Sequence, residues 1–225
     1  MWFESLTSQL SIPVERYWQA LLDTLMMVGV SSAVAFFAGV PLALLLIVTA
    51  PGGFLQSPTT NRLVGYVVNG FRAVPFIVLL VALIPFTRWL VGSSIGVWAA
   101  IVPLAISATP FFARIVEVSL REVDAGLIEA AQAMGSQKWH IVRHVYLPEA
   151  MPGIIGGFTI TLVALISSSA MAGAVGAGGL GDLAIRYGYQ RFDTQVMVIV
   201  IVLLVALVTI VQYAGDRYVQ WLKSR

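Results

Sequence analysis

Residues 195–214 have the sequence QVMVIVIVLLVALVTIVQYA, twenty positions in a row without Asp, Glu, Lys, Arg or His. An α-helix of that length rises about 30 Å, which is the thickness of the hydrocarbon core of a bilayer. The stretch therefore predicts a transmembrane helix, and it decides the class of fold.

Four further apolar stretches precede it, at residues 25–50, 63–86, 94–116 and 152–175. Hydrophobic residues make up 59% of the chain and charged residues 11%, whereas soluble domains are about 45–50% apolar and about 25% charged. A length of 225 residues leaves room for five spans and short loops but for no large soluble domain. We therefore expect an all-α membrane protein with five transmembrane helices in a single domain, residues 1–225.

The basic residues indicate how the spans are directed. If the N-terminus lies outside, nine basic residues fall on the inner side: Arg62, Arg72, Arg114, Arg121, Lys138, Arg143, Arg217, Lys223 and Arg225. Four fall on the outer side: Arg16, Arg88, Arg186 and Arg191. The positive-inside rule therefore predicts an N-out, C-in orientation.

Several classes of function lack the residues that they need. The third, fourth and fifth spans carry no ionisable residue near the middle, whereas ion-coupled carriers usually place acidic side chains at that depth. The chain has no Walker A motif, and its two lysines, Lys138 and Lys223, do not follow the required glycine. If ATP powers transport, another subunit must bind it. A net charge of +2 gives no indication of nucleic-acid binding, and zero cysteines exclude thiol chemistry.

Three short patterns that could indicate chemistry have simpler explanations. Residues 176–181 (GAGGLG) match G-x-G-x-x-G, but they follow a membrane span and not the strand of a βαβ unit. His140 and His144 have helical spacing without the Glu of H-E-x-x-H or an evident third metal ligand. The serines at 167–169 have no histidine base, because both histidines fall in the inner loop. We expect a flexible glycine turn, a polar histidine pair, and no catalytic or metal site.

The inner loop, residues 117–149, is too long to be a simple connector. Asp124 can cap a short helix, and Gly135 supplies a C-terminal stop. One face of that helix carries Leu127, Ala130, Ala131 and Met134. A second short helix is predicted from near Ser136 to just before Pro148. Such short helices are marginal alone, so the loop indicates a cytoplasmic docking partner.

This loop resembles the EAA loop of binding-protein-dependent ABC importer permeases. The matching residues are Glu129, Ala130, Ala131, Gly135, Val145, Leu147 and Pro148, with valine at 145 in place of the usual isoleucine. Similarity to the methionine-importer type of permease extends over most of the chain. It includes residues 71–76 (FRAVPF), 84–88 (IPFTR), 126–129 (GLIE) and 169–181 (SAMAGAVGAGGLG).

The resemblance implies a homodimeric permease of type I ABC importer architecture in the bacterial inner membrane, which takes up D- and L-methionine. It also implies two ATP-binding subunits on the cytoplasmic side, which hold the ATP and Mg, and a periplasmic or lipid-anchored substrate-binding protein. The chain itself would carry no cofactor and do no covalent chemistry. The alternatives are a permease for another amino acid or small solute, an ion-coupled secondary transporter and a passive channel.

Three groups of site residues follow from this resemblance and from the residues themselves. The ATPase-coupling interface is assigned to Leu127, Glu129, Ala130, Ala131, Met134 and Gly135. A gate in the permeation pathway is assigned to Ser168 and Met171, although Met171 could instead pack in the bundle core. Docking of the binding protein is assigned to Arg186, Tyr187, Tyr189 and Arg191, whose tyrosines could instead anchor the loop at headgroup level.

Overall fold

The computed structural model describes residues 11–53 and 55–224, and the elements within them are helices. They are α2 (Val14–Thr49), α3 (Pro58–Ala73), α4 (Phe76–Ala82), α5 (Ile84–Val91), α6 (Val97–Arg121), α7 (Ala125–Ala133), α8 (Lys138–Ile141), the π-helical turn η1 (Val142–Tyr146), α9 (Leu147–Gly173), α10 (Gly179–Leu183), the π-helical turn η2 (Ala184–Tyr189) and α11 (Thr194–Lys223). Four helices are long and apolar enough to cross a membrane, or five spans if the bent pair α3 and α4 counts as one. The predicted all-α membrane fold is confirmed. Residues 1–10, 54 and 225 of the predicted single domain lie outside the described residues.

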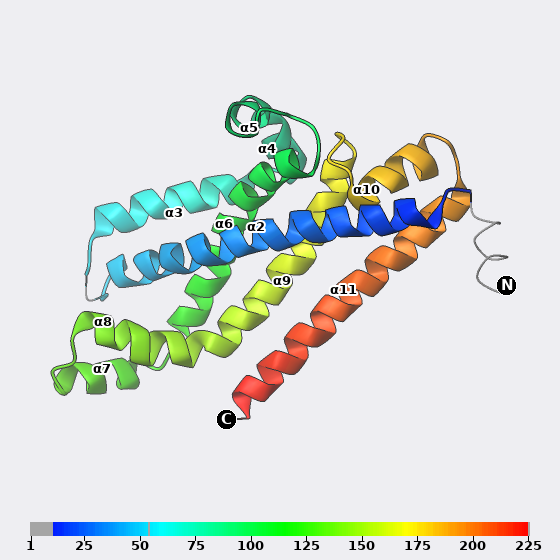
Figure 1. The fold of residues 1–225 in the computed structure, drawn as a ribbon. Helices are drawn as coiled ribbons and strands as arrows, with labels where there is room; N and C mark the ends of the chain where they lie inside the picture. Colours follow the sequence, from blue (N-terminus) through cyan, green and yellow to red (C-terminus); the bar gives the residue numbers. More distant parts are fainter. Residues whose placement is uncertain (1–10, 54, 225) are drawn as a thin grey trace.

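Helices α2, α6 and α9 form the core of the bundle. Figure 1 shows α2 running across the other two. The rings of Phe36 of α2, Phe112 of α6 and Phe158 of α9 pack against one another. Their ring centroids lie 5.3–5.7 Å apart. Gly39 on α2 allows this approach, because a Cβ there would lie 2.9 Å from Cδ1 of Phe112.

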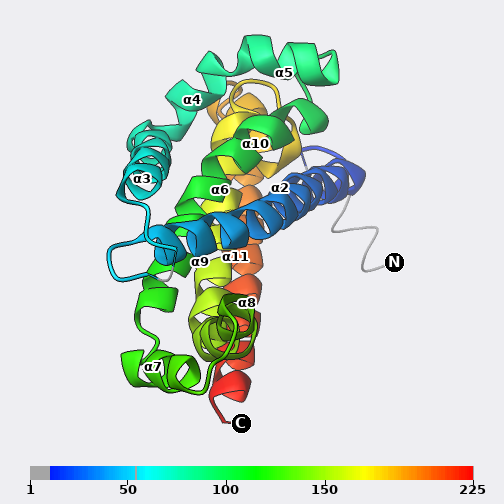
Figure 2. The same cartoon turned by 90° about the vertical axis from the view of Figure 1, so that its left-hand side faces the viewer.

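The second span, predicted as one apolar stretch at residues 63–86, is divided into separate helices. Helices α3 and α4 meet at an angle of 103°, and α4 and α5 lie over one end of the bundle (Figure 2). The break falls at Val74, which is extended, and Pro75. Proline lacks an amide hydrogen and disfavours a helical residue before it, which favours a break at this point.

The inner loop also differs from its prediction. The second short helix does not end before Pro148, because α8, η1 and α9 form one continuous helix, Lys138–Gly173. The turn η1 has the wider π-helical pattern, in which the amide of Leu147 donates to the carbonyl of Val142. Pro148 follows Leu147, whose amide closes this π-helical turn, so the irregular turn lies where a residue without an amide hydrogen enters the continuous helix.

The fifth span, α11, is the least buried of the long helices. It packs on α9 and η2, and Gly215 lies so close to Thr159 that a Cβ would overlap that side chain. Its other face exposes apolar side chains that include Val202, Val205 and Ile210. That face is suited to lipid or to a second copy of the chain.

The C-terminal end of α9 is held by backbone contact with α10. A Cβ at Gly173 would overlap the amide of Asp182, and one at Gly181 would overlap the backbone of Ala170. The buried Thr24 of α2 holds the same helix, since its hydroxyl accepts a hydrogen bond of 2.9 Å from the amide of Leu180. Three elements are therefore locked together at this end.

We predict that Gly181→Ala destabilises the protein by about 1–3 kcal/mol, because the atoms in the way are backbone atoms that cannot rotate aside. Gly65→Ala is the matched control, since nothing lies within 4 Å of its Cβ position. Thermal unfolding of both variants in detergent measures the difference. Equal midpoints would show that α9 and α10 are not tightly packed.

Candidate functional site

The predicted coupling helix is present as α7. The carboxylate of Asp124 accepts a hydrogen bond of 2.6 Å from the amide of Gly126, which confirms the predicted cap. Gly135 has a φ of +76°, a left-handed conformation that favours glycine, and it ends the helical segment as predicted. Local sequence signals therefore fix both ends of α7.

The six predicted coupling residues do not all share one face. Glu129, Ala130 and Gly135 are exposed, as are Leu127 at 47% and Met134 at 79%. These five can meet a partner protein. Ala131 is buried in a cluster with Ile141 and Tyr146, so it attaches α7 to the bundle and cannot contact a partner. The prediction that Ala131 shares an exposed apolar face with Leu127, Ala130 and Met134 is wrong. Helical spacing alone does not show which of these four residues turns toward the bundle.

A buried ion cluster lies just before α7. Glu117 of α6 is 1% exposed, and its two oxygens accept hydrogen bonds of 2.7 Å from Arg114 and from Arg121. Both arginines also reach solvent. This cluster was not predicted from the sequence, although the arginines at i−3 and i+4 from Glu117 are a pattern typical of such ion pairs on a helix. The cluster stabilises the C-terminal end of α6, and α7 begins four residues later.

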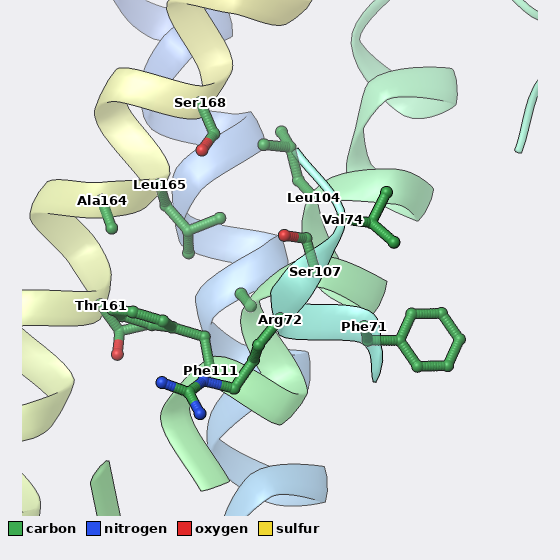
Figure 3. Close-up of a pocket in the computed structure, with 11 residues that line it drawn as sticks. Phe71, Arg72, Val74, Leu104, Ser107, Phe111, Thr161, Ala164, Leu165 and Ser168 are labelled. Carbon is green, nitrogen blue, oxygen red and sulfur yellow. The ribbon is translucent and has the colours of Figure 1, made fainter. Parts of the chain in front are cut away.

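A cavity of about 290 Å³ lies between α3, α6 and α9 (Figure 3). Leu104, Phe111 and Leu165 contribute apolar surface, and Ser107 and Ser168 contribute hydroxyls. Arg72 also lines it, at the last turn of α3 beside the break at Val74. The cavity is therefore amphipathic and carries one positive charge.

Arg72 was counted among the inner basic residues, and the structure places it at the C-terminal end of α3, beside the cavity. It lies fourteen residues beyond Pro58, the first residue of α3, which corresponds to about 21 Å along the helix. An arginine inside a membrane-spanning segment usually marks a functional site. The sequence analysis missed it because the bend after α3 was not predicted. The N-out, C-in orientation itself stays a prediction.

The two predicted gate residues face different spaces. Ser168 lines the cavity with Arg72. Met171 is half exposed and lines a separate apolar groove between α9 and α11, together with Leu204 and Val205. Their positions do not bring them together within one copy of the chain, and the alternative that Met171 packs in the core does not match its exposure either.

The segment that follows α9 consists of a glycine turn and two short helical elements, α10 and η2. The glycines at 176, 178 and 179 have φ values of +87°, +86° and +78°, and they lead directly into α10 and η2. Asp193 then caps α11 by accepting a hydrogen bond from the amide of Val196. The pattern G-x-G-x-x-G thus forms a tight turn between helices.

Tyr187 does not belong to the predicted docking surface. Its side chain is buried, its hydroxyl accepts a hydrogen bond from Arg16, and the guanidinium of Arg191 lies 4.6 Å from its ring centroid. Tyr189 is exposed, and Arg186 is half exposed while paired with Asp182. Because Arg16 belongs to α2, its hydrogen bond to Tyr187 joins η2 to α2.

The two histidines stack on one another with ring centroids 4.4 Å apart, and both are exposed. Within residues 11–53 and 55–224, no three His, Cys, Asp or Glu side chains come together in a way that could hold a metal ion. The pair therefore forms part of the surface of the segment after α7.

Residues 35–223 match the family described as binding-protein-dependent transport system inner membrane component. The chain belongs to this family. It is a multi-pass inner-membrane subunit of an ABC importer, and the type I importer fold expected from the sequence is confirmed, with four spans or up to five if α3 and α4 count as one.

Named relatives agree with this assignment. The chain is 48% identical over all 225 residues, the full length of both proteins, to the Probable D-methionine transport system permease protein MetI of Vibrio cholerae. It is 44% identical to the methionine import system permease protein MetP of Bacillus subtilis, with 92% of this chain and 93% of the relative aligned. It also superimposes on a chain of the MetNI methionine ABC transporter, solved in inward-facing conformations, with a TM-score of 0.91 and 49% identity over 94% of this chain and 99% of that one.

We predict that Glu117→Gln lowers the free energy of unfolding by about 1.5–3 kcal/mol, because neutral hydrogen bonds replace those between charged groups. The expected loss of protection from hydrogen exchange is local to the end of α6 and to α7. Glu122→Gln is the control, since Glu122 is exposed at the end of the same helix. Equal behaviour of the two variants would contradict a structural role for the cluster.

Proposed function

We propose that the chain is the transmembrane permease subunit of an ATP-driven importer that takes up methionine, as the D and L forms, across the bacterial inner membrane. Two copies form the pathway, two separate subunits bind ATP and Mg on the cytoplasmic side, and a periplasmic or lipid-anchored protein delivers the solute. The chain itself carries no cofactor and no catalytic group.

One observation carries the substrate assignment. Similarity to relatives named for methionine transport extends over the full length of the chain, and the MetNI chain superimposes over nearly all of it at the same level of identity. If the chain shared only a distant ancestor with these relatives and carried another solute, we would expect the similarity to be concentrated in the coupling loop, residues 117–149. The match instead includes the helices that line the cavity, α3, α6 and α9.

The geometry supports a mechanical route from the ATPase to the cavity. Closure of the ATPase pair would move α7, whose exposed face carries Leu127, Glu129 and Met134. Ala131 packs in a buried cluster with Leu120 of α6 and Ile141 of α8, which attaches α7 to both helices. Because α8 and α9 form one helix of 36 residues, displacement at its inner end reaches the cavity wall at Leu165 and Ser168.

The function is tested by purifying the chain with its co-expressed ATPase subunit and binding protein and by measuring ATP hydrolysis with each amino acid. Stimulation by methionine above other amino acids is the expected result. Stimulation by a different solute would support the alternative of a related importer. Uptake that collapses with the ion gradient while ATP remains would indicate an ion-coupled carrier.

The gate remains part of this proposal. Ser168 lines the cavity, and the flexible side chain of Met171 is half exposed on the adjoining groove. A methionine there can fill or vacate an irregular gap when a second copy of the chain covers it. The pathway would then be closed between the two copies.

We predict that Gly135→Val lowers uptake about tenfold or more while the amount of chain in the membrane stays unchanged. A β-branched residue resists the left-handed conformation at this position, so the turn that ends the coupling segment shifts. Gly135→Asn is the control, because asparagine adopts that conformation more readily. Normal uptake by the valine variant would show that the geometry of this turn is unimportant for coupling.

We predict that Tyr189→Ala weakens the affinity for the binding protein about fivefold or more, as expected for an exposed aromatic at an interface. Arg186→Glu should weaken it in a salt-dependent way, because exposed charges act through screened attraction. Tyr213→Ala is the control, since Tyr213 is equally exposed but lies toward the other end of α11. Unchanged affinity at low and moderate salt would move docking elsewhere, to the segment at residues 87–93.

A further inference from the structure

The cavity lies near the middle of the membrane-spanning helices. Ser107 is the eleventh of the 25 residues of α6, about 15 Å from its start. The facing wall belongs to the second half of α9, and α3 ends at the cavity. A solute that crosses along these helices therefore passes the cavity about midway along α6.

Arg72 has no acidic partner among the described residues. No described Asp or Glu lies within ion-pair distance of it, and its one side-chain hydrogen bond is a long one, 3.5 Å, to the amide oxygen of Asn69 on the same helix. An arginine at membrane depth is costly unless it is paired or faces a polar pathway. Its guanidinium extends from α3 toward the cavity, on the opposite side from Phe71 (Figure 3). The cavity thus presents a planar cation that is free to bind an anion.

Two hydroxyl groups in the wall of the same cavity are also available to a ligand. Ser167 and Ser169 donate hydrogen bonds to carbonyls of their own helix, whereas Ser168 between them makes no such bond within the described part of the chain. Ser107 on α6 likewise has no hydrogen bond there and lines the same cavity. Both hydroxyls can therefore donate to or accept from a polar solute.

The rest of the wall sets the size and character of the solute. Leu104, Phe111, Ala164 and Leu165 form an apolar surface next to the polar groups. The volume of about 290 Å³ is at the lower limit of small-molecule sites, which begin near about 300 Å³. The cavity can hold one small amphipathic molecule but not an oligopeptide.

We propose that this cavity is a transient binding site for the zwitterionic amino acid inside the membrane, and that Arg72 binds its α-carboxylate. A guanidinium matches a carboxylate with two parallel hydrogen bonds. Ser107 and Ser168 contact the polar end, and the apolar wall receives the side chain. A single cation without a second charged group holds the solute weakly, as release into the cell requires. This inference rests on the proposed function and names the chemistry of its pathway.

The test uses the complete complex with Ala164→Cys as a probe. The chain has no natural cysteine, so this thiol is the single reactive sulfhydryl in it, and Ala164 lines the cavity. The rate of maleimide modification is followed on this chain while methionine or methioninamide, which lacks the carboxylate, is added. We expect methionine to slow modification about tenfold at saturation and methioninamide to have little effect.

The variants of Arg72 decide the assignment. Arg72→Gln should abolish the protection by methionine, and Arg72→Lys should retain part of it, since the positive charge remains. Arg62→Gln is the matched control, because Arg62 is exposed on the same helix but does not line the cavity. Size-exclusion chromatography confirms that each complex is assembled. Full protection in Arg72→Gln, or equal protection by methioninamide, overturns the proposal.

Two further outcomes separate this inference from others. If an anionic phospholipid protects the thiol through Arg72 and methionine does not, the cation serves a lipid phosphate and the proposal is wrong. If methionine fails to stimulate ATP hydrolysis but another amino acid does, the substrate assignment fails. The protection assay is then run with that amino acid, and protection that requires its carboxylate and Arg72 still supports the site.

Discussion

A bilayer offers no hydrogen-bond partner to an exposed peptide group, and this constraint governs the whole structure. Long helices satisfy it internally, which is why the apolar stretches become α2, α6, α9 and α11. Breaks survive only where other parts of the protein cover them. The amide of Leu180 finds the hydroxyl of Thr24, and the break at Val74 adjoins the cavity. These two irregular points of the backbone therefore lie where helices are hydrogen-bonded to one another or where the bundle encloses the cavity.

The sequence predicted the class of fold because twenty apolar residues in a row have few other solutions. It predicted the ends of α7 because Asp124 and Gly135 act through local backbone geometry. The bend after Val74 and the continuity through Pro148 were not predictable in the same way. A proline can begin, kink or end a helix, and the surrounding structure decides which. The spans were also too short, since charged residues mark the edge of the apolar stretch and not the end of the helix.

In the site as well, residues that are close in the sequence were predicted, and residues that only the fold brings together were not. The coupling segment is contiguous in the sequence, so its exposed residues were found, although Ala131 turned out to face inward. The cavity is built from α3, α6 and α9, and no pattern in the sequence brings Arg72 together with Ser107. The continuous helix from α8 to α9 joins these two parts, because it begins beside α7 and ends beyond the cavity.

The central claim is that this cavity opens on the pathway between the two copies and that ATP on a partner subunit changes the side from which it is reached. The measurement is the reactivity of Ala164→Cys, within the reconstituted complex, toward a membrane-impermeant thiol reagent added to one face at a time. The account predicts reaction from one face without nucleotide and from the opposite face with a non-hydrolysable ATP analogue. Reaction from the same face in both states, or from both faces at once as in a passive channel, would contradict it.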